Sequence, residues 1–239
     1  MLERGLTPAA LGEALGVDHK TVERWIAGRL PYRKYRYDVA SRLGVEEAYL
    51  WPDALSREQV AAASDSEIVA VYPHRSDVPR DIWGRLFDSA QREIGVLVYS
   101  GLFLAEDSGI QKILAARARA SAGVRVRILL GDPASPQVAD RGADEGVDDA
   151  MAAKIRNALM LYRSLNGTDG VEFRFHSTIL YNSIYRGDDQ LLVNTHIYGL
   201  TAARAPVWHL RKIAGGEITA IYLDSFERVW DTAVPIPGT

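Results

Sequence analysis

The chain has 239 residues with a formal net charge of −3, and it contains no cysteine. This length suits one small and one medium domain. The absence of cysteine excludes disulfides, thiolate metal sites and cysteine nucleophiles. The slightly negative net charge argues against non-specific coating of nucleic acid, so any DNA contact must come from a local patch. No apolar run approaches the roughly 18 residues that span a bilayer, and we therefore expect a cytoplasmic protein with no membrane partner.

Two short helices joined by a tight turn are predicted at the start of the chain. Thr7 is a suitable N-cap with Pro8 at the first helical position, and Gly16 ends this helix. Asp18 caps the second helix, which Gly28 follows. The apolar residues predicted to face inward are Leu11, Ala14, Leu15, Val22, Trp25 and Ile26. This pattern predicts a helix-turn-helix unit.

The second of these helices presents polar and cationic side chains on its outer face. Between His19 and Arg36 the chain has six cations and one anion, a surplus that suits the neutralisation of DNA phosphates. A helix held at a steep angle by a Gly-containing turn is the geometry that enters a major groove. Predicted base contacts come from His19, Lys20, Thr21 and Arg24, and predicted phosphate contacts from Arg29, Arg33 and Arg36. The alternative is that these residues form only the basic, solvated face of a small helical domain.

The stretch from Leu6 to Gly28 resembles the helix-turn-helix of the lambda-repressor-like family, also called the xenobiotic-response-element (XRE) family. The resemblance implies that the partner is double-stranded DNA. Two more helices are predicted, over residues 35–43 and 45–50. The predicted DNA-binding domain covers residues 1–54, and a linker covers residues 55–75.

Residues 76–239 are predicted to form an α/β domain around a mixed sheet, because strands and helices alternate along the chain. Strands are expected in this domain over 94–99, 124–130, 171–175 and 191–196, and a short strand is expected over 68–72 at the end of the linker. Helices are expected over 81–92, 110–122, 149–165 and 218–233, with a polar loop over 131–148. The predicted fold class is therefore a small all-α helix-turn-helix domain followed by a mixed-sheet α/β domain.

A ligand site is predicted where the carboxyl ends of the strands meet, as in other sheets of this class. The candidate ligand-binding residues are Arg141, Glu145, His176, Asn182, Tyr185, Asn194, His196, His209 and Arg211. Asn194 and His196 alternate along one strand and so share a face, which favours a common site. Each candidate has a structural alternative. Arg141 and Glu145 also fit a solvated surface pair, and the two histidines His176 and His196 also fit satisfied structural positions.

Residues 173–196 resemble, in two stretches, one half of the phospholipase D fold, where one strand ends in HxK and another in GSxN. His176 falls on the nucleophilic histidine of that family and Asn194 near its terminal asparagine, while Thr178 and Ser183 replace the lysine and the aspartate. Phosphoryl transfer needs cations at the equatorial oxygens. Without that lysine, we expect a domain with no catalytic residues. Since HExxH, Walker, GxSxG and GxGxxG motifs are also absent, no metal or other cofactor is predicted.

Together the two predicted domains resemble XRE-family regulators of actinobacterial type that carry a C-terminal phospholipase-D-like domain. The resemblance implies a DNA-binding transcription regulator that forms a homodimer and senses a small-molecule effector. One alternative is a phosphodiesterase or nuclease completed by dimerisation, with His176 from each subunit. Another is a protein-interaction module in which the cleft at the strand ends is only structural.

Overall fold

A computed structural model describes residues 7–45, 47–51, 65–120 and 123–237. The contacts within the chain divide it into two compact units, residues 1–66 with 213–217 and residues 67–212 with 218–239. Most of the predicted linker, residues 55–64, lies outside the described residues. In the described part of the chain, no helix is both long enough and apolar enough to cross a membrane.

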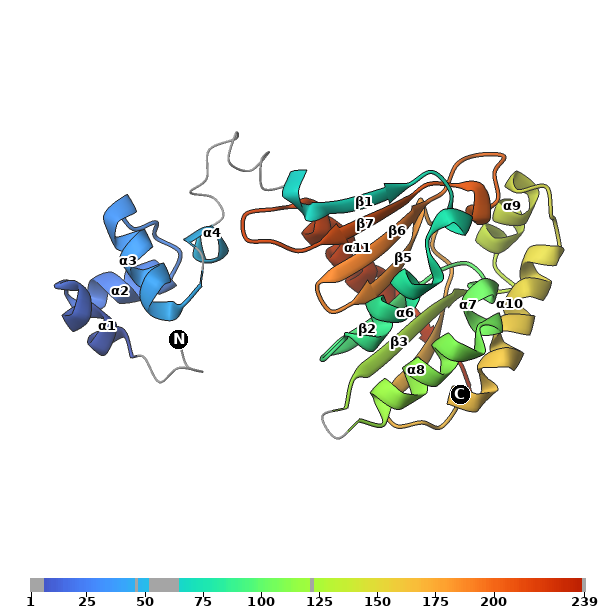
Figure 1. Ribbon diagram of the computed structural model, residues 1–239, viewed down its shortest axis with the longest axis horizontal. Helices are drawn as coiled ribbons and strands as arrows, with labels where there is room; N and C mark the ends of the chain where they lie inside the picture. The colour runs from blue at the N-terminus through green and yellow to red at the C-terminus, as the bar shows by residue number, and fades with distance from the viewer. Residues whose placement is uncertain (1–6, 46, 52–64, 121–122, 238–239) are drawn as a thin grey trace. The chain divides into compact units, whose positions relative to one another are not determined.

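The first unit contains the helices α1 (Pro8–Leu15), α2 (His19–Ile26), α3 (Arg33–Leu43) and α4 (Glu47–Leu50), coloured in blue in Figure 1. Thr7 caps α1, since its hydroxyl accepts a hydrogen bond from the N–H of Ala10 at 3.2 Å. Gly16 ends α1 in the left-handed region with φ 66°, which glycine adopts without strain. Asp18 caps α2 by accepting from the N–H of Lys20 at 2.8 Å. The predicted starts of both helices, and the end of α1, are confirmed.

The core of the first unit is small. Its buried apolar residues are Leu11, Val22, Val39, Ala40 and Leu43, and the rings of Trp25 and Trp51 pack against them. Ile26, predicted to face inward, is instead 59% exposed, because it stands in the last turn of α2, where the described helices do not cover it. Ala14 is also exposed. These two inward predictions were wrong.

The second unit is built on one eight-stranded mixed sheet. Its strands are β1 (Ile68–Tyr72), β2 (Glu93–Leu97), β3 (Arg125–Gly131), β4 (Val171–His176), β5 (Asn182–Gly187), β6 (Gln190–Thr195), β7 (Val207–Arg211) and β8 (Val234–Pro235). The order across the sheet is β1-β7-β6-β5-β2-β3-β4-β8. Strands β2, β3 and β4 are parallel to one another, and the other neighbours pair antiparallel. β1 falls within the range predicted as a linker, and it pairs with β7.

Helices cover both faces of this sheet (Figure 1). They are η3 (Arg75–Asp77), α6 (Arg80–Asp88), α7 (Leu102–Glu106), α8 (Ser108–Ala118), α9 (Pro136–Asp144), α10 (Ala150–Leu161), η4 (Tyr162–Leu165), η5 (Ala202–Arg204) and α11 (Ile218–Thr232). Trp83 of α6 packs edge-on against Tyr185, with ring centroids 4.8 Å apart. Arg186, the residue that follows Tyr185 on β5, pairs with Glu227 of α11. Because successive strand residues point to opposite faces, α6 and α11 cover opposite faces of the sheet.

The structure differs from the sequence-based elements in several places. The segment expected to be a polar loop, residues 131–148, contains α9, which Ser135 caps and Pro136 begins. Val138 is its one buried apolar side chain, so the apolar periodicity that reveals a helix was too weak there. Strands β5 and β7 and helix α7 were also not predicted.

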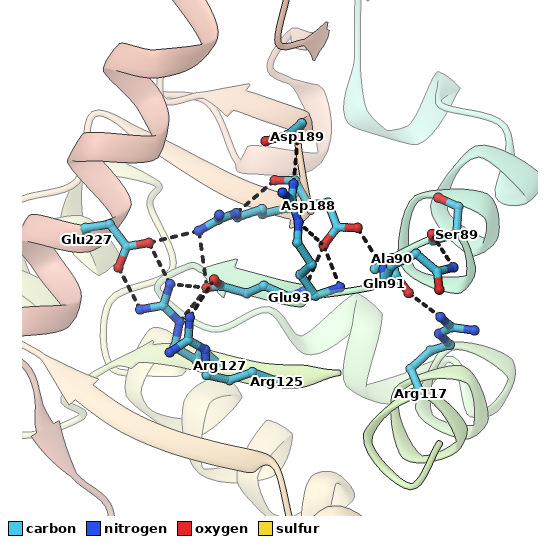
Figure 2. Close-up of polar contacts among 12 residues, drawn as sticks. Ser89, Ala90, Gln91, Glu93, Arg117, Arg125, Arg127, Asp188, Asp189 and Glu227 are labelled. Carbon is cyan, nitrogen blue, oxygen red and sulfur yellow. Dashed lines mark hydrogen bonds and ion pairs between the residues drawn. The ribbon is translucent and has the colours of Figure 1, made fainter. Parts of the chain in front are cut away.

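A partly buried cluster of charged residues ties α11 to the sheet (Figure 2). Arg127 of β3 lies between the carboxylates of Glu93 and Glu227, and its guanidinium contacts the ring of Trp230 at 4.8 Å. Arg186 of β5 pairs with Glu227 at 2.8 Å. Glu93 begins β2, so the cluster lies at the amino end of the parallel strands and away from their carboxyl ends.

Candidate functional site

The exposed face of α2 is the first candidate site. His19, Lys20, Glu23 and Arg24 are all exposed, and Thr21 is half-buried. Val22, on the opposite side, is 1% exposed and anchors the helix in the core. Because a Cβ atom on Gly12 would lie only 2.8 Å from the carbonyl oxygen of Val17, glycine allows the turn to pass close to α1. This contact fixes the direction in which α2 leaves the turn.

The remaining predicted phosphate contacts lie in different surroundings. Arg29 is exposed just after α2. Arg36 instead donates from Nε to Glu47 at 2.6 Å, and its side chain is only 14% exposed, so it holds α3 against α4. The side chain of Arg33 lies outside what the structure describes. Lys34, one of the six cations of this stretch, lies over the ring of Tyr35 at 4.4 Å and is exposed.

The second candidate site is a cavity of about 300 Å³ in the second unit. It lies at the carboxyl end of β2, and residues of β5, α7, α10 and η5 contribute to its wall. The lining residues are Arg75, Tyr99, Ser100, Gly101, Leu102, Phe103, Glu106, Glu145, Met151, Lys154, Ser183, Tyr185, His196, Thr201, Ala202 and Ala203. Its volume falls at the lower end of the range of small-molecule sites.

His196 stands in this wall with both ring nitrogens engaged. Nδ1 lies 3.0 Å from the carbonyl oxygen of Leu180, and a carbonyl only accepts, so Nδ1 carries the hydrogen. Nε2 then accepts from the hydroxyl of Ser183 at 3.0 Å. The ring stacks on that of Tyr99 with centroids 5.7 Å apart. Burial and then the nearby charge of Arg141 lower the pKa of His196 to about 4, so this imidazole is neutral at pH 7.

Two tyrosines complete the polar part of the wall. The hydroxyl of Tyr99 accepts from the N–H of Leu180 at 3.0 Å, and burial raises its pKa. Tyr185 is 1% exposed, and burial raises its pKa although the charge of Arg75 acts in the opposite direction. The guanidinium of Arg75 lies over the ring of Phe103 at 3.9 Å. The cavity therefore combines neutral hydrogen-bonding groups with a cation.

Four of the predicted ligand residues lie at or beside this cavity. Tyr185, His196 and Glu145 line it, whereas Arg141 lines an adjoining cavity of about 390 Å³ together with His196. Arg141 and Glu145 form a buried ion pair at 2.6 Å, with side chains 7% and 5% exposed. They are therefore not a solvated surface pair.

The other predicted ligand residues are used elsewhere. His176 is 2% exposed, donates from Nε2 to the carbonyl of Val98 at 3.0 Å and accepts at Nδ1 from the N–H of Thr178 at 3.3 Å. Burial lowers its pKa. Asn194 is fully buried and donates from its amide to the carbonyls of Ala205 and Pro206. Both side chains fit the structural alternative.

Asn182, His209 and Arg211 are not among the residues that line the cavity. Asn182 begins β5 and pairs with Thr195. His209 faces Gln190, and Arg211 pairs with the same residue at the far end of β6. The strand β7 therefore carries its polar side chains toward the opposite end of the sheet.

No protein-family model matches the chain, and no curated protein matches it. Among solved structures, the chain is similar to TrmBL2, described as an archaeal chromatin protein with a novel mode of DNA binding. The two sequences are 16% identical, and the match covers 85% of this chain and 65% of the TrmBL2 chain, with a TM-score of 0.42. This chain thus spans a little under two thirds of the TrmBL2 chain. A similarity this weak carries no functional conclusion.

Sequence-based reasoning included Tyr185 among the ligand residues but not Ser183, Arg75 or Lys154, which also line the cavity. Ser183 and Tyr185 alternate along β5, a period that would have placed both on one face once the strand was recognised. Arg75 precedes α6 by five residues, and Lys154 comes from the middle of α10. No local pattern links these two cations to the strand ends, because only the packing of η3 and α10 brings them there.

Proposed function

We propose that this chain is a sequence-specific, double-stranded-DNA-binding transcription regulator, with a helix-turn-helix of the XRE type in its first unit. The observation that carries the proposal is the exposed polar face of α2, which follows a tight turn and is anchored by the buried Val22. His19, Lys20, Thr21 and Arg24 would contact bases from the first two turns of α2. Arg29 and the exposed Lys34 would hold phosphates.

The second unit, in this proposal, is a phospholipase-D-like domain without catalytic function. Both ring nitrogens of His176 are engaged with main-chain groups, which leaves no lone pair for attack on phosphorus. The domain would pair two subunits so that their α2 helices meet half-sites about one helical turn, roughly 34 Å, apart. A small molecule in the cavity beside His196 would favour one arrangement of that dimer and so change DNA affinity.

The decisive experiment is a selection of bound sequences from random duplex DNA. The wild type and the Lys20→Ala/Arg24→Ala variant would be compared, with Lys112→Ala/Arg228→Ala as a control that removes two exposed cations from the second unit. We expect a two-fold symmetric motif with the wild type and the control. The α2 variant should lose it, because each base contact contributes about 1–3 kcal/mol. A wild type that enriches no motif, or a motif that survives in the α2 variant, would refute the proposal.

The enzyme alternative has its own test. Turnover of a chromogenic phosphodiester that disappears in His176→Ala would show that the second unit is a phosphodiesterase. We expect no turnover in either protein.

A further inference from the structure

The cavity in the second unit contains two cations for which the described residues supply no ion-pair partner. Arg75 and Lys154 both line it, and neither appears in an ion pair within the described part of the chain. In contrast, Arg141 beside the cavity is fully paired with Glu145. The cavity thus has positive charge that the described protein groups leave uncompensated.

Arg75 is held in place by contacts other than ion pairs. Its main-chain N–H donates to the carbonyl of Ala205 at 3.0 Å, which fixes the start of η3. Its guanidinium makes a cation–π contact with Phe103, at 3.9 Å from the ring centroid. A side-chain hydrogen bond to Tyr185 also holds the guanidinium. The side chain is therefore positioned in advance, and its remaining N–H groups can bind a ligand.

The charge of Arg75 affects the pKa values of two side chains in the wall of the cavity. It contributes to the lowered pKa of His196, after burial and Arg141, and it opposes the rise that burial causes in the pKa of Tyr185. Both side chains are neutral at pH 7, so they add no charge to the wall, and both ring nitrogens of His196 are already engaged with Leu180 and Ser183. Ser183 of β5 also lines the cavity, and its hydroxyl donates to Nε2 of His196.

The acidic residues of the lining do not cancel this charge. Glu145 is already neutralised by Arg141 at 2.6 Å. Glu106 is exposed, so water and salt screen its carboxylate. Leu102, Phe103 and the buried Met151 supply the apolar part of the lining.

We propose that this cavity binds a small organic oxyanion, a carboxylate or a phosphate monoester with an apolar part, through Arg75 and Lys154. The inference deepens the effector role proposed above and rests on it. Arg75 would form paired hydrogen bonds to two oxygens of the anion, and Lys154 would add a point charge. The hydroxyl of Tyr185 would complete the polar contacts, and Leu102 and Phe103 would cover the apolar part. A cavity of about 300 Å³ limits the ligand to a small molecule.

The test uses the full chain without DNA and three probes of similar shape, namely benzoate, phenyl phosphate and the neutral benzamide. Thermal unfolding at millimolar probe and titration calorimetry would be measured for the wild type. We expect at least one of the two anions to raise the unfolding temperature and to release or absorb heat on binding, and benzamide to do neither. The stronger of the two anions then distinguishes a carboxylate ligand from a phosphate.

Matched variants locate the binding. Arg75→Gln should raise the Kd of the anion at least about tenfold, since a charge-assisted hydrogen bond is lost, and Arg75→Lys should have a smaller effect. Lys154→Gln should weaken binding, whereas the exposed controls Lys112→Gln and Arg228→Gln should leave it unchanged. The unfolding temperature without probe shows whether each variant is folded.

The proposal fails if neither anion binds the folded wild type, if benzamide binds as well as benzoate, or if Arg75→Gln binds the anion as the wild type does. These results do not depend on the DNA selection. Binding of the anion without enrichment of a DNA motif would refute only the DNA-binding proposal. Enrichment of a DNA motif without binding of the anion would refute only the anion site.

Discussion

The carboxylate of Glu67 accepts a hydrogen bond from the main-chain N–H of Thr219 at 2.9 Å, although 152 residues separate the two in the chain. It also accepts from the N–H of Ile218 at 2.8 Å. Glu67 is fully buried, just before β1, and α11 begins at Ile218. An acidic side chain at a helix N-terminus satisfies N–H groups that have no partner within the helix. Glu67 thus joins the edge strand of the sheet to the last helix.

Replacing Glu67 tests this capping contact. Glu67→Ala should destabilise the second unit by about 2–4 kcal/mol, because two buried N–H groups lose their acceptor. Glu67→Gln keeps one acceptor oxygen and should cost less. Denaturant unfolding of the three proteins would measure the difference. Equal stabilities for Glu67→Ala and the wild type would contradict the capping role.

In the cluster of Figure 2, two arginines that differ in exposure pair with the same carboxylate. Arg127 and Arg125 both pair with Glu93, but the side chain of Arg127 is 5% exposed and that of Arg125 is 65% exposed. Arg127→Ala should cost about 3–5 kcal/mol, because Glu93 remains buried with fewer partners. Arg125→Ala should cost less than about 1 kcal/mol. Urea unfolding would measure both, and similar losses would show that burial is not what makes the contact strong.

Two glycines in helices should respond in opposite ways to alanine. A Cβ atom on Gly12 would lie 2.8 Å from the carbonyl oxygen of Val17, whereas on Gly84 its nearest neighbour would be Ile113 Cδ1 at 3.9 Å. Gly12→Ala should therefore loosen the turn between α1 and α2 and cost about 1–3 kcal/mol. Gly84→Ala should stabilise α6 by about 0.4–1 kcal/mol.

Hydrogen exchange of the amides in α1 and α2 would report the first change, and denaturant unfolding the second. Unchanged exchange in Gly12→Ala would show that the turn tolerates a side chain there. DNA binding should weaken in Gly12→Ala and stay unchanged in Gly84→Ala, if α2 is the helix that enters the major groove.

The second unit should lose stability in mild acid because of His196. Its pKa in the folded chain is about 4, lowered from 6.5 by burial and then by Arg141. The unfolded chain therefore binds this proton first as the pH falls, so stability is lost between pH 6.5 and about 4. At about 1.36 kcal/mol for each pH unit, the loss from this group approaches roughly 3 kcal/mol. His196→Gln should flatten the pH dependence, measured by urea unfolding between about pH 7 and pH 5. An unchanged slope would contradict the prediction.

Much of the first unit could be predicted because its signals are local. The cap residues Thr7 and Asp18 act within one helical turn of themselves, and Gly16 ends a helix through its own backbone conformation. The same is true of the buried runs that became β2 and β3, since a continuous apolar stretch of that length suits a strand covered on both faces. These elements needed no information from distant residues.

The exposure of single side chains was harder to predict. Arg36 belongs to the basic run after α2, yet it pairs with Glu47 eleven positions later. Ile26 continues the apolar stripe of Val22 but lies in the last helical turn, where the described helices leave it exposed. In both cases the exposure of the side chain depends on whether another helix covers it.

By itself, the sequence determined where most helices and strands lie, and which helix of the first unit has a polar outer face. Only the tertiary structure decided which strand-end residues meet at a cavity. It placed His196, Ser183 and Tyr185 together with Arg75 and Lys154, and it turned His176 and Asn194 to main-chain partners. The physical reason is that caps and periodicity act over a few residues, whereas a cavity depends on strand order, register and helix packing between distant segments.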